Sequence, residues 1–269
     1  MPRFSLFTYG VLPLALLAAA SNPALAQDPL KVFAAGSLTG PLTVLAKQFE
    51  ADTGAPVELV FGPSGLLLER IEQGEPVDVF ASANMAHPRQ LAREGKATPP
   101  LVFARNRVCV LARPELQLNT ENLLAKLLDP AVNIGTSTPK ADPGGDYAWI
   151  LFAKAGKVQP GASELLEGKA QQLVGGKNSP PAPAGQDAAK YFLERKQVDA
   201  FIGYCSSRQT THDARFTKVE LPAELAVSAD FGLTVLNPRS GSHDTAYRFA
   251  LFLLTPEARQ TLVDYGFSK

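Results

Sequence analysis

Two serines follow predicted strands where predicted helices begin. Ser37 closely follows the apolar run 31–35, and Ser64 closely follows the apolar run 57–61. At such a junction, free backbone N–H groups and the positive end of the helix face outward together, which suits an anion. Each serine can instead serve only as the cap of its own helix. Because neighbouring parallel strands end at the same edge of a sheet, the two turns together favour a ligand site at that edge.

Three residues in the second half of the chain offer donors of the same uncharged kind. Gly144 and Gln186 lie just before predicted helices, and Tyr204 ends the predicted strand 198–204. Glycine lets backbone approach a ligand closely, and a tyrosine hydroxyl can donate at the mouth of a cleft, although Tyr204 can equally be an ordinary aromatic residue at the rim. Asp146 would repel an anion if it pointed inward, and would stabilise its own helix if it did not.

The elements that must hold these residues alternate between strand and helix. Strands are predicted at 31–35, 57–61, 77–81, 106–112, 134–136, 198–204 and 231–236, and helices at 38–49, 65–73, up to 91, 147–155, 187–195 and within 245–267. The alternation predicts an α/β fold with mostly parallel sheets flanked by helices. We interpret 106–112 and 231–236 as crossings between two lobes. Lobe I would comprise residues 27–105 and 238–269, and lobe II residues 106–237.

The first residues have the three parts of a secretory signal peptide. Arg3 precedes an apolar stretch from Val11 to Ala20, and small residues precede a predicted cut after Ala26. An uncleaved membrane anchor is the alternative, but the stretch is short for a bilayer and Pro13 interrupts it. We therefore predict an exported, periplasmic protein that does not itself span the membrane.

Charge and cysteine content narrow the classes of partner. The chain carries 26 basic and 26 acidic residues, so no global field would attract nucleic acid, and local geometry would have to hold any bound anion. The chain has two cysteines, Cys109 and Cys205, and the predicted compartment favours disulfides. A pair of separate buried thiols is an equally open alternative. Neither has a second Cys or a His at the spacing of a metal site.

Several short stretches resemble the periplasmic molybdate-binding component of ABC importers. They are VFAAGSLT at 32–39, FGPSG at 61–65, GEPVDVFASA at 74–83, TPEA at 255–258 and YGF at 265–267. The resemblance implies a type II periplasmic-binding-protein fold, in which two lobes close about a hinge around a ligand cleft. It also implies a monomer that delivers its ligand to a membrane permease and needs no cofactor.

In that family, uncharged donors hold the oxyanion. The resemblance carries Ser37, Ser64 and Tyr204 over as hydroxyl donors, and assigns backbone N–H groups to the turns at Gly144 and Gln186. Burying a dianion requires a hydrogen bond to every oxygen, and such bonds contribute about 1.5–3 kcal/mol each. Fixed donors would select by size, so molybdate and tungstate should bind alike and the smaller sulfate should fit loosely.

The sequence also leaves ligands other than molybdate and tungstate open. Asp142, Asp146 and Asp187 could line the same cleft and bind a metal cation. The two-lobed architecture would equally admit another small anion or an organic acid. Pro63 removes one backbone donor, and the loop 179–184 is rich in proline, so the identity of the ligand is not fixed by the resemblance.

A serine hydrolase is the competing enzyme class. The turn at 62–66 lacks the last glycine of a nucleophile elbow, and the segment 137–140 matches Ser-x-x-Lys only with a proline inside the helix that the pattern needs. No spacing suggests a triad for the three histidines, His87, His212 and His243. We therefore predict that the protein is not an enzyme and has no catalytic residues.

Overall fold

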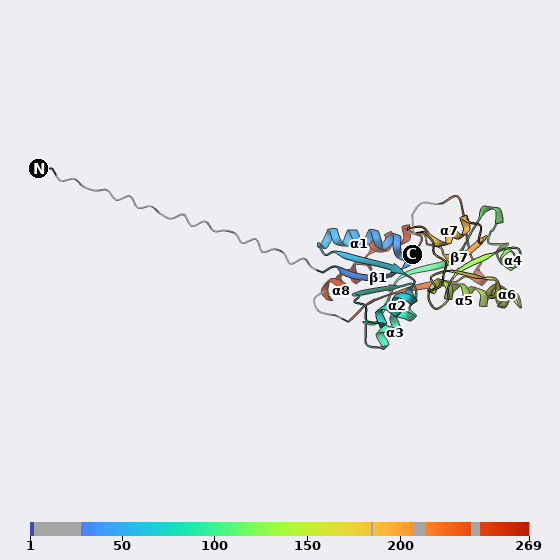
Figure 1. The fold of residues 1–269 in the computed structure, drawn as a ribbon, viewed down its shortest axis with the longest axis horizontal. Coiled ribbons are helices and arrows are strands. Elements are labelled where there is room, and N and C mark those ends of the chain that lie inside the picture. The colour runs from blue at the N-terminus through green and yellow to red at the C-terminus, as the bar shows by residue number, and fades with distance from the viewer. Residues whose placement is uncertain (3–27, 184, 207–212, 238–242, 269) are drawn as a thin grey trace.

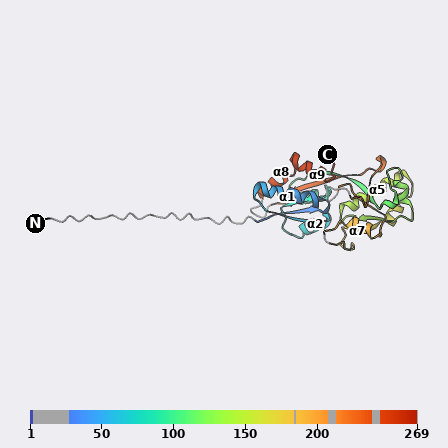
Figure 2. The same ribbon diagram turned by 90° about the horizontal axis from the view of Figure 1, so that it is seen from above.

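The chain folds into two lobes that lie side by side and are joined by long strands (Figure 1, Figure 2). The computed structural model describes residues 1–2, 28–183, 185–206, 213–237 and 243–268. The predicted signal peptide and its cut after Ala26 lie outside the described residues, as does His212. Within the described ranges, no helix is long and apolar enough to cross a membrane.

Three parallel strands form the middle of the first lobe. β1 (Leu30–Ala35) lies between β2 (Val57–Gly62) and β3 (Val79–Ser82). Because side chains of a strand alternate between the two faces of a sheet, Val32 packs against one layer of helices and Phe33 against the other. Both faces of β1 are therefore buried, which explains why its sequence is an almost continuous apolar run.

Helices cover both faces of this first sheet. One layer contains α1 (Thr39–Thr53), α8 (His243–Phe252) and α9 (Pro256–Asp264), and the other contains α2 (Ser64–Glu72) and α3 (Ala86–Arg93). The rings of Phe49 in α1 and Phe249 in α8 meet edge to face, with their centroids 5.1 Å apart. The two ends of the chain thus share one hydrophobic core.

The second lobe repeats this arrangement. β5 (Ile134–Ser137) lies between β6 (Gln171–Val174) and β7 (Ala200–Tyr204), and all three are parallel. One face is covered by α4 (Leu123–Leu128), α5 (Pro143–Val158) and α6 (Ala162–Lys169), and the other by α7 (Ala188–Glu194). Three short 3-10 turns complete the helical elements: η1 (Gly36–Leu38), η2 (Pro114–Leu116) and η3 (Ala223–Leu225).

Two long strands cross between the lobes, as the sequence predicts. β4 (Leu101–Ala112) and β9 (Ser228–Val235) pair antiparallel, from Leu101 opposite Leu233 to Arg107 opposite Ser228. β4 then continues into the second lobe, where it pairs with β7 and with β8 (Thr217–Glu220). Since the pairing is continuous, the lobe boundaries at 105/106 and 237/238 stay a prediction.

The strands of both lobes form one sheet path, β2-β1-β3-β9-β4-β7-β5-β6, with β8 attached to β4. Pairings among β1–β3 and among β5–β7 are parallel, and each antiparallel pairing described involves β4 or β9. The fold is therefore the expected α/β type, with the crossing strands as the antiparallel exception.

A disulfide joins Cys109 of β4 to Cys205, which follows β7, and their Cα atoms are 4.9 Å apart. Of the two readings that the sequence left open, the disulfide is the one the structure contains. Cys109 lies opposite Gly203 in the β4–β7 ladder. The bond therefore fixes the end of β7, where Tyr204 lies, to a crossing strand.

Candidate functional site

A cavity of about 560 Å³ lies where the two lobes face each other, and residues of both lobes line it. The first lobe contributes the turns after β1 and β2, which bring Ser37 and Ser64 to the same edge of the sheet. The second lobe contributes Asp142, Asp187 and Tyr204, among others. Because β1 and β2 are parallel neighbours, the predicted meeting of the two serine turns at one sheet edge is confirmed.

Ser37 lies within the 3-10 turn η1 and does not cap it, since the capping position is occupied by Ala35. Its Oγ atom is buried and has no hydrogen-bond partner in the described part of the chain. A buried hydroxyl without a partner is costly, so it marks a place where a ligand or an ordered water can supply the missing bond. The reading of Ser37 as a simple helix cap is therefore wrong.

Ser64 is the first residue of α2, and the preceding Pro63 is its N-cap without any capping side-chain bond. Ser64 is 1% exposed, and its Oγ accepts the backbone N–H of Ala83 at 3.1 Å. A hydroxyl that accepts one bond keeps its own proton for donation. Ser64 is thus fixed from behind by the chain after β3 and can donate into the cavity.

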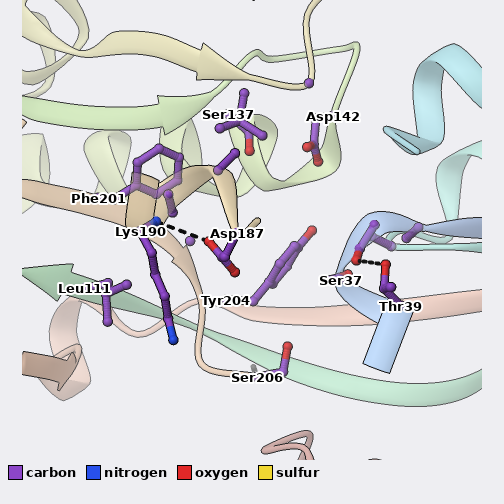
Figure 3. A pocket seen from close by; sticks show the side chains of 18 of the residues that line it. Ser37, Thr39, Leu111, Ser137, Asp142, Asp187, Lys190, Phe201, Tyr204 and Ser206 are labelled. Atoms are coloured by element: carbon purple, nitrogen blue, oxygen red, sulfur yellow. Dashed lines mark hydrogen bonds between the residues drawn. The ribbon is translucent and has the colours of Figure 1, made fainter. Parts of the chain in front are cut away.

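Tyr204 ends β7, and its hydroxyl is buried without a hydrogen-bond partner within the described ranges. Burial, and then the nearby Asp142, Tyr147 and Asp146, raise the pKa of Tyr204 well above its ordinary value. The hydroxyl is therefore protonated and can donate. Its ring is held edge to face against Phe231, with the centroids 5.5 Å apart. In Figure 3 the hydroxyl points toward the space between Asp142 and Ser37.

Asp142 places a carboxyl group in the cavity lining. In the sequence, the neighbouring Asp146 is the acid that was expected to repel an anion if it pointed inward. The Asp142 Oδ1 accepts the backbone N–H of Gly144 at 2.9 Å, and this bond and the nearby Ser137 side chain act to lower the pKa of the carboxyl group. Burial is the main cause that raises the pKa of Asp142. The N–H of Gly144, which the resemblance assigns to the ligand, is therefore bonded to Asp142 in this structure, and Gly144 itself is not among the lining residues.

Asp146 faces away from the cavity. It accepts the backbone N–H of Lys140 at 2.8 Å, and it is not among the lining residues. Burial raises the pKa of Asp146, while the bond from Lys140 opposes this effect. The sequence left open whether Asp146 points into the cleft. The structure shows it hydrogen-bonded within its own lobe and absent from the cavity lining.

Gln186 lies outside the cavity lining. Its side chain is exposed, and its backbone N–H donates to the carbonyl oxygen of Pro183 at 3.1 Å. Its neighbours Gly185 and Asp187 do line the cavity. The Asp187 side chain accepts the backbone N–H of Lys190 at 3.2 Å and so caps α7.

The cavity extends from the serines into the second lobe, where its lining changes character. Leu111, Phe201 and Phe216 are apolar members of this part of the lining. The lysines are held by other groups: Lys190 pairs with Asp213 at 2.9 Å, and Lys218 donates to the carbonyl oxygen of Cys205 at 2.9 Å. The sequence analysis missed this extension, because its residues come from separate elements with no common motif.

Three of the contacts described join the turns and helices of the first lobe to those of the second. The N–H of Gly65 donates to the carbonyl oxygen of Ala141 at 2.9 Å, and the Tyr147 hydroxyl donates to the carbonyl oxygen of Ala83 at 3.3 Å. On the surface, Lys177 pairs with Glu69 at 2.6 Å. These contacts place the N-terminus of α2 against the segment before α5, so the structure is a closed arrangement of the lobes.

Two competing kinds of site lack support in the described residues. No group of three or more His, Cys, Asp or Glu side chains in the described part of the chain could hold a metal ion. His87 does not line the cavity; it lies in α3, where burial lowers its pKa to about 4. Ser137 lines the cavity, but no histidine of the described residues is among the lining residues.

Comparison with known proteins decides the family. Residues 30–268 match the family described as bacterial extracellular solute-binding protein. The chain belongs to this family. The match covers both lobes and both crossing strands, so it concerns the whole fold and not one motif. Its relatives are solute-binding proteins, not enzymes.

Individual members of the family show what the chain is similar to. An uncharacterised protein of Pasteurella multocida is 39% identical over 206 residues, which are 76% of this chain and 86% of that one. The molybdate-binding protein of Rhodobacter capsulatus is 25% identical over 261 residues, 96% of this chain and 95% of that one. The solved periplasmic molybdate-binding protein of Azotobacter vinelandii is 21% identical with a TM-score of 0.71, covering 89% of this chain and 99% of that one. The sequence resemblance to molybdate-binding proteins is therefore confirmed, and the solved structure supports the fold.

Proposed function

We propose that this solute-binding protein captures molybdate, or tungstate of the same shape, in the cavity between its lobes. As a periplasmic monomer, it then delivers the oxyanion to the membrane permease of an ABC importer. The observation that carries the proposal is a pair of buried hydroxyls, Ser37 from one lobe and Tyr204 from the other. Both line one cavity, and neither has a hydrogen-bond partner among the residues that the structure describes. The molybdate-binding relatives support the choice of ligand.

The donors are chemically suited to a dianion. Ser37, Ser64 and Tyr204 are uncharged, and hydrogen bonds to a charged group contribute about 1.5–3 kcal/mol each. Several such bonds offset the cost of taking the oxyanion out of water. Since donors from both lobes are needed to surround it, binding also favours the closed arrangement over an open one.

Calorimetric titration tests the proposal directly. The protein without its signal segment would be titrated with molybdate, tungstate, sulfate, phosphate and divalent cations. We expect molybdate and tungstate to bind in the micromolar range or tighter, at least about −8 kcal/mol, and sulfate to bind much more weakly. Heat with divalent cations alone would overturn the proposal and favour the cation alternative.

The size of the cavity favours a second candidate, an oxyanion that carries an organic group. A tetrahedral oxyanion occupies about the volume of two or three water molecules, at roughly 30 Å³ each. The cavity measures about 560 Å³, and its extension is lined by Leu111, Phe201 and Phe216. Titration with small phosphate monoesters distinguishes the two candidates. Tighter binding of an ester than of molybdate would favour the second.

A further inference from the structure

The carboxyl group of Asp142 is fixed in the compartment that Ser37, Ser64 and Tyr204 share. Its Oδ1 accepts the N–H of Gly144 at 2.9 Å, and Ser137 at the end of β5 lines the same cavity. Gly175 provides the room behind it: a Cβ atom at this position would lie 2.6 Å from the Asp142 Oδ2. The φ angle of Gly175 is +79°, a conformation that favours glycine. Asp142 is thus built into the site.

No cation neutralises Asp142. Within the described residues it forms no ion pair, and no titratable side chain of the first lobe lines the cavity. From the second lobe, the titratable groups around the cavity are the Tyr204 hydroxyl from β7, the Asp187 carboxylate before α7, the Lys190–Asp213 pair, and Lys218, which is bonded to the carbonyl oxygen of Cys205. On its own helix, Asp146 adds a further negative charge, which the charge of Lys140 partly offsets. Lys177, which is not among the lining residues, is paired with Glu69 on the surface.

A fully ionised oxyanion would therefore be repelled by an ionised Asp142 at this wall of the cavity. Its oxygens are acceptors, and an ionised Asp142 offers only acceptors in return. Two like charges would face each other in a buried site, which strongly disfavours ionisation of both. A single shared proton removes the conflict, because it turns the contact into a charge-assisted hydrogen bond.

We propose that the site binds its oxyanion together with one proton, held between the Asp142 carboxyl group and an oxyanion oxygen. This inference rests on the proposed function, since it concerns the same oxyanion site. The balance is simple: dianion, proton and protein combine, and no bond other than the O–H bond forms or breaks. Burial, which raises the pKa of Asp142, acts in the same direction.

The source of the proton depends on the ligand. Molybdate, tungstate and sulfate are fully ionised near neutral pH, so the proton must come from the solvent. Their affinity should then fall by about tenfold per pH unit above the pKa of Asp142. An oxyanion that already carries a proton, such as hydrogen phosphate, brings it along. Its affinity should not show this fall while the ligand stays protonated.

Titration calorimetry of the complete exported protein with molybdate tests the proposal. The protein would be titrated from about pH 5.5 to about pH 8.5, in buffers of different ionisation enthalpy. We expect one proton to be taken up per molybdate bound at the alkaline end. We expect Asp142→Asn to lose both the proton uptake and the pH slope, because the carboxamide supplies a permanent donor. Asparagine also caps helices well, so α5 should be retained.

Asp146→Asn is the matched control. Asp146 lies on the same helix and its pKa is also raised by burial, but its carboxylate is bonded to Lys140 outside the cavity lining. This variant should keep the wild-type proton uptake. Molybdate binding without proton uptake, or an unchanged slope in Asp142→Asn, would overturn the inference and leave the proposed function standing. Absence of oxyanion binding by wild type and both variants at every pH would overturn both.

Discussion

At the scale of single residues, the two serines of the cavity differ in the hydrogen bonds that they form within the protein. Ser64 accepts the N–H of Ala83 and is part of the first lobe's own bonding, whereas the Oγ of Ser37 has no partner. Both face the cavity from equivalent strand ends. Substitution of Ser64 should therefore affect both stability and binding, whereas substitution of Ser37 should affect binding alone.

Ser37→Ala and Ser64→Ala should each weaken molybdate binding by roughly ten- to 150-fold, because each removes a bond to a charged group of about 1.5–3 kcal/mol. Their effects on the free energy of unfolding should differ. Ser64→Ala also leaves the buried N–H of Ala83 without its acceptor, at a cost of about 1–3 kcal/mol, whereas Ser37→Ala breaks no bond within the protein. Titration calorimetry and urea unfolding measure the two effects. Loss of stability in both variants, with affinity unchanged, would contradict the binding role.

Tyr204→Phe should lower molybdate affinity by at least tenfold without destabilising the protein, because it removes a buried hydroxyl that no protein group satisfies. Thr136→Val is a matched control: its Oγ1 is also buried without a partner, but Thr136 does not line the cavity. The control should bind molybdate like the wild type. Equal affinity losses in both variants, measured by titration, would show that the Tyr204 hydroxyl acts through packing and not through the ligand.

At the scale of elements, the site depends on where helices begin. α5 starts at Pro143, well before the predicted 147, because Asp142 is an N-cap and proline suits the first helical position. The order Asp-Pro is a signal that could have revealed this start and the direction of the Asp142 side chain. Asp146 is the more prominent of the two acids in the sequence, because it lies closer to the helix predicted from the apolar residues.

The strands that hold the serines were predictable for a different physical reason. β1 is buried on both faces, so its apolar run is distinct, and Ser37 follows at once. β6 and β8 were missed because their sequences, QQLV and TKVE, are short and at least half polar. The loop around Gln186 could not be placed, since proline and glycine indicate a loop without fixing its path.

Gly65→Ala should weaken molybdate binding by hindering closure of the lobes. A Cβ atom at Gly65 would lie 2.3 Å from the carbonyl oxygen of Lys140 in the other lobe. In the open protein the same change should be harmless, because alanine favours a helix over glycine by about 1 kcal/mol. We expect at least tenfold weaker binding, corresponding to about 1–3 kcal/mol of overpacking, and an unchanged or higher melting temperature.

Gly168→Ala in α6 is the control, because a Cβ atom there would have no heavy atom within 4 Å. Titration calorimetry gives the affinity, and small-angle X-ray scattering with molybdate reports whether the lobes close. Wild-type affinity in Gly65→Ala would show that the contact between α2 and Ala141 does not accompany binding.

At the scale of the whole molecule, β4 and β9 join the two lobes, and the disulfide joins β4 to the end of β7. Cys109 and Cys205 are 96 residues apart in the chain, so their bond closes most of the second lobe into one loop. Cross-linking restricts the unfolded chain most when the loop is long. The bond lies within one lobe and does not tie it to the other.

Reduction of this disulfide should lower the free energy of unfolding by about 4–5 kcal/mol, the value expected for a loop of this length. Urea unfolding with and without reductant measures the change. The double variant Cys109→Ala/Cys205→Ala should have the lower stability in both conditions and no response to reductant. A wild type whose unfolding midpoint ignores reductant would contradict this expectation.

The hydrophobic core that the first and last elements share also affects the order in which the two lobes can fold. β1 and α1 are the first elements, yet they pack against α8 and α9, which are the last. A chain delivered from its amino terminus can complete the second lobe while the first still lacks these helices. The serine half of the cavity therefore forms last, although its residues are made first, and a partly delivered chain cannot yet trap a ligand.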